Sequence, residues 1–256
     1  MRFFLPLFVL LPLCAQDVDT LLKDAKALVD KQDYDGAITV YGKAIAIAPS
    51  DPRPFLERGH RYLNTRRFKE GLADLDQAEK LAPNVSEVAY HRALAHYLMG
   101  DFKGAAKLYK RCLSVTTPAT GKDNMRTCGP DSEKDPGGRV GMTDWAYRAN
   151  RRAGDQAEAK RLLAAVPDGL KLEAGNEAYY RTLRYYKGSL TADQALDGLK
   201  GVYFAGTGYG VANFQILEGK KAEGCALLQK VLDVKEGHYG WGAVAGEIEL
   251  KKSCGR

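Results

Sequence analysis

The 256-residue sequence lacks several features that would point to chemistry. It has no block of five or more like charges, which argues against a nucleic-acid-binding arm. It has no CxxC pair, so a zinc finger or zinc ribbon is not expected. HExxH and GxSxG motifs are also absent. We therefore expect no metal, no cofactor and no catalytic residue, and no nucleic acid among the partners.

Long hydrophobic runs are also missing, except at the start of the chain. Residues 1–15 read MRFFLPLFVLLPLCA, and their apolar run over 3–13 is too short for a membrane-spanning helix of roughly 20 residues. We interpret residues 1–15 as a secretory signal peptide cut after Ala15, which predicts an exported protein, periplasmic or secreted. A rival cut before Cys14 would leave a lipid anchor, but Leu13 is larger than the small residue that such a cut favours.

Four cysteines remain after cleavage, Cys112, Cys128, Cys225 and Cys254. Their spacing favours two local disulfides, Cys112 with Cys128 and Cys225 with Cys254, in an oxidising compartment. Small buried cysteines within helices are the alternative.

The first half contains three copies of one pattern at a constant interval. An aromatic residue and, three positions later, a small residue recur at Tyr34 and Ala37, Phe68 and Gly71, and Phe102 and Ala105. Each copy has an apolar stripe at helical spacing, a polar turn and a second helix, and the first copy predicts helices over 19–31 and 34–48. One hairpin cannot bury its apolar face alone. The sequence therefore predicts an all-α solenoid of about four to six stacked antiparallel hairpins.

This pattern resembles the tetratricopeptide repeat (TPR), whose length of about 34 residues equals the interval between the copies. The second copy matches the motif best, at Gly59, Tyr62, Phe68, Gly71, Ala78 and Pro83. The resemblance places three TPR repeats in residues 16–119. It implies a scaffold or adaptor that binds a protein or peptide and is not an enzyme.

The second half is less regular. Residues 120–141 are rich in Gly, Pro, Asp and Lys and are predicted to form an irregular loop, and residues 142–256 predict degenerate hairpins with a closing helix over 241–251. The glycines of 206–210 are interpreted as a flexible lead-in to the last hairpin. Segments such as WAYRANRRAGD and GYGVANFQILEGKKAEG resemble bacterial envelope TPR proteins of the NlpI-like kind, which implies an adaptor that gathers envelope enzymes.

The first helix of each repeat is expected to line a concave groove. Seven side chains project onto this predicted groove: Lys26, Arg53, His60, Asn64, Tyr90, Leu94 and Tyr97. Tyrosines would supply contact area, and the cations would bind acidic side chains or a terminal carboxylate. A solvated face is the alternative. The carboxylate clamp of chaperone-binding TPR proteins is not expected, because Glu57 and Glu87 occupy two of its places.

Arg148, Arg151, Arg152 and Arg161 form a second basic cluster in the fourth hairpin. With a formal net charge of +6, it suggests an acidic protein partner or an anionic envelope polymer; a solvated helix face is again the alternative. Two other function classes stay open. One is a hydrolase or metal-dependent enzyme that uses His60, His91 or His96, and the other is an oligomeric structural scaffold.

Overall fold

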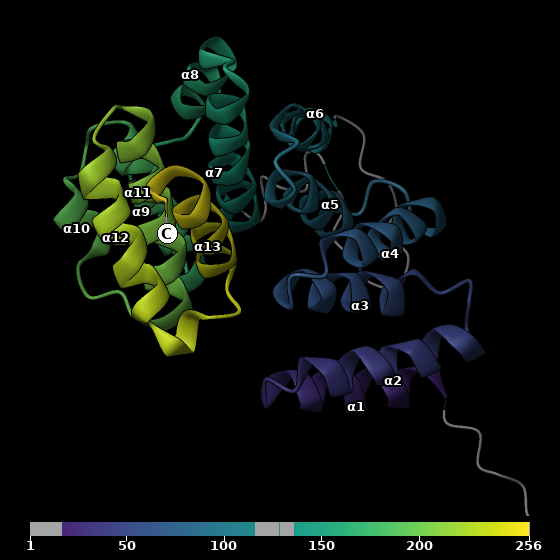
Figure 1. Cartoon of the computed structure of the whole chain (residues 1–256). Coiled ribbons are helices and arrows are strands. Elements are labelled where there is room, and N and C mark those ends of the chain that lie inside the picture. Colours follow the sequence, from purple (N-terminus) through teal and green to yellow (C-terminus); the bar gives the residue numbers. More distant parts are fainter. Residues whose placement is uncertain (1–16, 116–127, 129–135, 256) are drawn as a thin grey trace, which may run out of the picture.

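The computed structural model describes residues 17–115, residue 128 and residues 136–255. Every element assigned in this part of the chain is a helix, which confirms the all-α prediction (Figure 1). None of these helices combines the length and the hydropathy that crossing a bilayer requires. The predicted signal peptide and Cys14 lie outside the described residues.

The first half consists of three antiparallel hairpins that stack in chain order (Figure 1). Their helices are α1 (Val18–Asp30) with α2 (Tyr34–Ile47), α3 (Pro52–Asn64) with α4 (Phe68–Leu81), and α5 (Ser86–Leu98) with α6 (Phe102–Leu113). The small residues of the repeat lie where paired helices approach most closely. A Cβ atom added at Gly59 would stand 3.0 Å from the carbonyl oxygen of Gly71, so a larger side chain would force α3 and α4 apart.

The second half continues the stack with three further hairpins. Their helices are α7 (Pro136–Ala153) with α8 (Gln156–Ala164), α9 (Ala174–Tyr186) with the short α10 (Ala192–Leu196), and α11 (Gly201–Leu217) with α12 (Lys221–Asp233). A 3-10 helix, η3 (Lys235–Gly237), then leads into the closing helix α13 (Trp241–Cys254). Six hairpins agree with the expected four to six.

The turn inside each hairpin has the same backbone conformation throughout the chain. One residue with a positive φ angle stands in each turn: Gln32, Arg66, Gly100, Gly154, Gly188 and Gly219. The first three recur at the interval of the sequence repeat, and Gly154 and Gly188 are separated by the same interval after the predicted loop. The repeat that the sequence displays in the first half therefore persists in the backbone of the second half.

Two expectations for the second half are wrong. The predicted loop over 120–141 extends too far, because α7 already begins at Pro136, and proline is well suited to the first turn of a helix, where its missing N–H has no partner to lose. The glycines of 206–210 are not a flexible lead-in, because they lie inside α11. A Cβ atom at Gly208 would stand 2.6 Å from Cγ2 of Val231, so glycine here permits close packing of α11 on α12.

The predicted disulfides are confirmed. Cys112 is bonded to Cys128, and Cys225 is bonded to Cys254. The first bond attaches Cys128 to the end of α6. The backbone amide of Cys128 also donates to the carbonyl of Asn84 at 2.8 Å. The second bond ties the end of α13 to α12, so each bond constrains one half of the chain.

The stack curves until its last segment meets its first repeats (Figure 1). The Nδ2 atom of Asn64 donates to the carbonyl of Tyr239 at 2.7 Å, across 175 positions of sequence. Arg66 donates to Glu247 at 3.2 Å and to the carbonyl of His238 at 3.0 Å. The chain therefore forms a curved stack that closes on α3.

The second half is built around a buried ion pair. The guanidinium of Arg148 on α7 donates to the carboxylate of Asp144 one turn earlier and, at 3.1 Å, to the hydroxyl of Tyr186 on α9. Both charged side chains are fully buried. Gly210 makes room for them on α11, since a Cβ atom there would stand 2.7 Å from Nη2 of Arg148. The pair thus joins three helices in the interior.

We expect Asp144→Asn to lower the free energy of unfolding by ~3–5 kcal/mol, because it leaves the Arg148 charge buried without a counter-ion. Urea unfolding followed by circular dichroism measures this. The double variant Asp144→Asn with Arg148→Met should recover most of the loss, since it removes both charges. An equal loss in the single and double variants would contradict a charge-based explanation.

Candidate functional site

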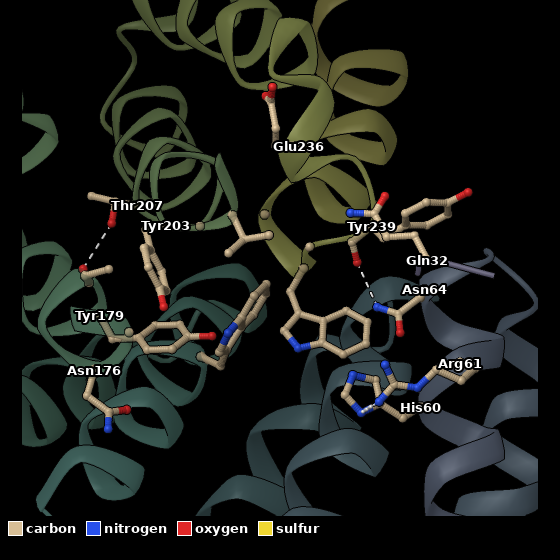
Figure 2. Close-up of a pocket in the computed structure, with 18 of the residues that line it drawn as sticks. Gln32, His60, Arg61, Asn64, Asn176, Tyr179, Tyr203, Thr207, Glu236 and Tyr239 are labelled. Atoms are coloured by element: carbon tan, nitrogen blue, oxygen red, sulfur yellow. Dashed lines mark hydrogen bonds between the residues drawn. The ribbon is translucent and has the colours of Figure 1, made fainter. Parts of the chain in front are cut away.

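A cavity of about 390 Å³ lies where the C-terminal segment meets the first repeats (Figure 2). Its volume lies within the range of small-ligand sites. The first repeats contribute Gln32, Tyr34, His60, Arg61 and Asn64; α7 and α9 contribute Trp145, Asn176 and Tyr179; α11 contributes Tyr203, Gly206 and Thr207; and the C-terminal segment contributes Glu236, Tyr239 and Trp241. The cavity therefore exists only where the two halves of the chain meet.

One side of the cavity is a cluster of aromatic rings in tilted and edge-to-face contact. The ring of His60 lies 4.1 Å from that of His91 and 4.8 Å from that of Trp241, measured between centroids. Trp241 also contacts His91 edge to face at 5.6 Å. Tyr239 packs edge to face on Tyr34 at 4.4 Å. The first residues of α13 thus fill part of the concave side that the sequence predicted to be an open groove.

The two histidines in this cluster are neutral at pH 7. Burial lowers the pKa of His60 well below its usual value and that of His91 to about 4. Because a guanidinium can only donate, Nδ1 of His60 accepts from Arg61 at 2.7 Å. Nδ1 of His91 donates to the carbonyl of Glu87 at 2.8 Å, because a carbonyl can only accept. Both rings of this cluster are therefore neutral with fixed tautomers, and His60 is the one that lines the cavity.

We expect the free energy of unfolding to fall as the pH falls from 6.5 towards 4. In this window the unfolded chain binds protons at His60 and His91 that the folded chain excludes, so the loss is ~1.4 kcal/mol per pH unit for each histidine. Urea unfolding at several pH values measures the slope. His91→Phe should reduce the slope, because it removes one of the two histidines. The same slope in the parent protein and in His91→Phe would contradict this.

Three buried polar atoms in the cavity lining have no hydrogen-bond partner among the described residues. They are Nε of Arg61, Oδ1 of Asn64 and Nε1 of Trp145. A buried polar atom without a partner costs about 1–3 kcal/mol. Each of these atoms has almost no accessible surface, so they lie beneath the wall of the cavity and a ligand in it does not contact them directly.

Of the seven predicted groove residues, only His60 and Asn64 line this cavity. Lys26 is exposed and pairs with Asp30, and Arg53 pairs with Asp19 and Asp51. These two cations lie on the first repeats but outside the cavity lining.

The other three predicted groove residues face the interior. Tyr90 is half-buried and its hydroxyl lies 3.4 Å from that of Tyr179. Leu94 and Tyr97 are buried in the largest hydrophobic cluster, and the hydroxyl of Tyr97 bonds to that of Tyr209 at 2.7 Å. The prediction that Leu94 and Tyr97 line an open groove is wrong, because helices of the second half cover that end of the concave face.

The predicted basic cluster is also wrong. Arg148 is fully buried against Asp144, and Arg152 is paired with the buried Glu249 at 2.5 Å. The remaining two arginines bind separate partners, Arg151 with Glu218 and Arg161 with Glu158. These four cations therefore form no common surface for an acidic partner, because intramolecular carboxylates bind them.

No sequence motif marks the aromatic residues that the C-terminal half contributes to the site. The sequence marks Trp241 only as the first residue of a closing helix, and no pattern singles out Tyr239 or Tyr203. One signal is present, since the chain has two tryptophans and both line the cavity. Without knowledge of how the stack curves, the sequence does not show that the two tryptophans lie at the same site.

The hydrolase hypothesis gains no observation from the structure. Within the described part of the chain, no three His, Cys, Asp or Glu side chains are grouped as a metal would require. The hydrogen bonds of His60 and His91 go to Arg61 and to the main chain. His96 at the end of α5 contacts the carboxylate of Asp101 at 2.8 Å, but neither residue lines the cavity.

Comparison with known proteins agrees with this architecture. A model of the TPR repeat matches residues 25–65, and a tetratricopeptide repeat model matches residues 87–115. The chain contains tetratricopeptide repeats. These matches lie in the first half. The resemblance of the second half to NlpI-like proteins stays a prediction.

Relatives share the repeats but are longer proteins. The heat-shock protein cognate co-chaperone sgt12 of Aspergillus fumigatus is 28% identical over 93 residues, which is 36% of this chain and 27% of that protein. Human serine/threonine-protein phosphatase 5 is 30% identical over 84 residues, 33% of this chain and 17% of that protein. The chain thus matches less than a third of the length of either relative.

The fold likeness extends beyond these matches. A crystal structure of a tetratricopeptide repeat protein from Parabacteroides merdae superimposes with a TM-score of 0.56 at 12% identity. That match covers 91% of this chain and 86% of the other. The second half therefore shares the solenoid fold, although its sequence motifs are weak.

Proposed function

We propose that this TPR protein is an exported adaptor that binds a protein or peptide partner at the cavity between its first repeats and its C-terminal segment. The observation that carries the proposal is the cavity, which combines aromatic walls with the polar side chains of Asn176 and Glu236, both of which retain exposed surface. Binding sites typically join an apolar surface to a few placed polar groups. The relatives support a binding role, since one of them is named a co-chaperone.

The chain itself supports export. Residues 1–15 have the composition of a secretory signal, and two disulfides join the four cysteines that follow them. Disulfides persist in oxidising compartments and are rare in the cytosol. The proposed location is therefore periplasmic or secreted, with lipid attachment at Cys14 as the rival form of export.

The location is tested by expressing the full chain and measuring the mass of the protein in each fraction. We expect the exported fraction to contain a protein that begins at Gln16 and whose four cysteines resist alkylation until reduced. A protein that retains residues 1–15 and stays in the cytoplasm would contradict export. A mass that fits a lipid on Cys14 would replace cleavage after Ala15 by the rival cut.

The binding role is tested by recovering partners from the exported fraction with immobilised protein. Tyr203 lies at the rim of the cavity and is 42% exposed, so Tyr203→Ala should lower the recovery of a saturable partner by about tenfold or more. Ile47→Ala is the matched control, because Ile47 is a large exposed apolar residue outside the cavity lining. Equal recovery by the parent protein and both variants would reject the cavity as the binding site.

Oligomeric assembly is a separate hypothesis. Four large apolar residues are exposed in the described part of the chain, namely Ile47, Met99, Val202 and Tyr203. Val202 and Tyr203 are adjacent and line the cavity, which fits a partner better than a broad self-association surface. Light scattering of the purified protein measures the mass that decides this.

A further inference from the structure

We infer that the cavity binds a small organic cation, in which one ammonium group is attached to an apolar or aromatic body. The ammonium group lies beside Glu236 at the mouth, and the body lies against the rings of the lining. The inference goes beyond the proposed function, because it assigns a low-molecular-weight ligand to the cavity and does not need a protein partner. It follows from the charges, the aromatic rings and the size of the cavity.

The lining carries one negative charge that no described cation offsets. Arg61 and Glu236 are the charged residues of the lining. Arg61 is paired with Glu57 at 3.3 Å, and the buried ring of His60 is neutral at pH 7. Glu236 forms no ion pair with any residue that the structure describes. A ligand with a single positive charge would therefore balance the lining, whereas a carboxylate would add a second negative charge to it.

Glu236 lies at the mouth of the cavity, next to the first turn of α11 (Figure 2). A Cβ atom on Gly201, the first residue of α11, would stand 3.7 Å from Cβ of Glu236. Tyr203 belongs to the same turn, and Glu236 and Tyr203 are both exposed and both line the cavity. Lys235 is exposed too, but it does not line the cavity. A carboxylate and an aromatic ring thus stand together where a ligand enters.

Most aromatic rings of the lining have no cation over them among the described residues. The guanidinium of Arg61 stands 5.8 Å from the ring centre of Tyr34. That of Arg148 stands 4.5 Å from the ring of Trp145. The tyrosine and tryptophan rings of the lining without such a neighbour are Tyr179, Tyr203, Tyr239 and Trp241. Because the face of an aromatic ring is negative, these rings can attract the cation of a ligand as the other two attract arginine.

The cavity has room for the body of such a ligand. Its volume of about 390 Å³ lies in the range of small-ligand sites. Figure 2 shows Tyr179 and Tyr203 on one side and His60 on the other, with the C-terminal segment between them. Apart from its own stretch of α11, no described atom lies within 4 Å of the point where a Cβ atom on Gly206 would stand. An apolar body therefore finds aromatic surface and space behind the charged mouth.

Three probes that share a phenyl ring and differ in charge test the inference. They are 2-phenylethylamine, 2-phenylethanol and phenylacetate. Both tryptophans line the cavity, and Trp241 is only half-buried, so tryptophan emission is the readout and ligand-observed NMR is the second measurement.

We expect the amine to bind about tenfold tighter than the alcohol, because a cation–π contact and an ion pair act together, and phenylacetate to bind most weakly. Higher salt should weaken binding of the amine more than binding of the alcohol. Equal binding of the amine and the alcohol, or tightest binding of phenylacetate, would overturn the inference.

Methylammonium tests the need for a body. It carries the charge without the ring, so it should bind about tenfold more weakly than 2-phenylethylamine or weaker still. Methylammonium that binds as tightly as 2-phenylethylamine would show that the rings of the lining contribute nothing, and the inference would be wrong.

Glu236→Gln should weaken binding of the amine by about threefold and leave binding of the alcohol unchanged, because it removes a partly exposed charge. Glu70→Gln is the matched control. Glu70 is exposed on α4, outside the cavity lining, and forms no ion pair within the described part of the chain. Unchanged affinity for the amine in Glu236→Gln, or an equal loss in Glu70→Gln, would overturn the inference.

Gly206→Leu should abolish binding of the amine, because the new side chain fills the cavity without removing any lining side chain. Gly42→Leu is its control. Gly42 also lies in a helix, outside the cavity, and a Cβ atom there would stand 3.5 Å from Nη1 of Arg58. Circular dichroism checks the fold. Unchanged binding of the amine in folded Gly206→Leu would overturn the inference, and if this variant does not fold, the comparison of Glu236→Gln with Glu70→Gln decides.

The inference and the adaptor role can fail separately. If the parent protein recovers a partner from the exported fraction but binds the three phenyl probes equally, the inference is wrong and the adaptor role stands. If Glu236→Gln weakens binding of the amine as expected but no partner is recovered, the adaptor role loses its support and the cation site stands.

Discussion

The contact of Trp241 with His60 and His91 closes the curved stack, and the candidate site depends on it. Each hairpin can bury its apolar face only against a neighbour, so the hairpins must stack. A small rotation between successive hairpins makes the stack curve. Here the curve is tight enough for Tyr239 and His238 to bond to α3 and the turn that follows it. A flatter stack of the same hairpins would leave the concave face open and would contain no cavity.

The buried ion pairs of the second half also stabilise this closed arrangement. Asp144 and Arg148 join α7 to α9 and α11, and Arg152 joins α7 to Glu249 on α13. Buried charges require specific partners in specific places, so they favour one arrangement of these helices over many similar apolar packings. The ion pairs thereby fix the positions of α7, α9 and α11, which form walls of the cavity.

The part of the site that could be predicted from the sequence is the part contributed by one repeat. His60 and Asn64 follow from their register on α3, because a helix presents residues three and four positions apart on one face. Leu94 and Tyr97 follow the same rule on α5 and yet are buried, because α7 and α11 cover that end of the face. The cluster from Arg148 to Arg161 looked basic in sequence because its carboxylate partners, such as Glu218 and Glu249, are distant along the chain.

Local order in this protein can be read from the chain alone: helix ends, turns that recur at the repeat interval, the proximity of Gly59 to Gly71, and disulfides between cysteines close in sequence. These features depend on interactions within one hairpin or between adjacent ones, which periodicity reveals. Only the tertiary structure decides the curvature of the stack. The curvature in turn decides which side chains line the cavity and which lie in the core. Curvature sums small rotations over six hairpins, so contacts between residues 34–66 and residues 238–247 leave no periodic trace in the sequence.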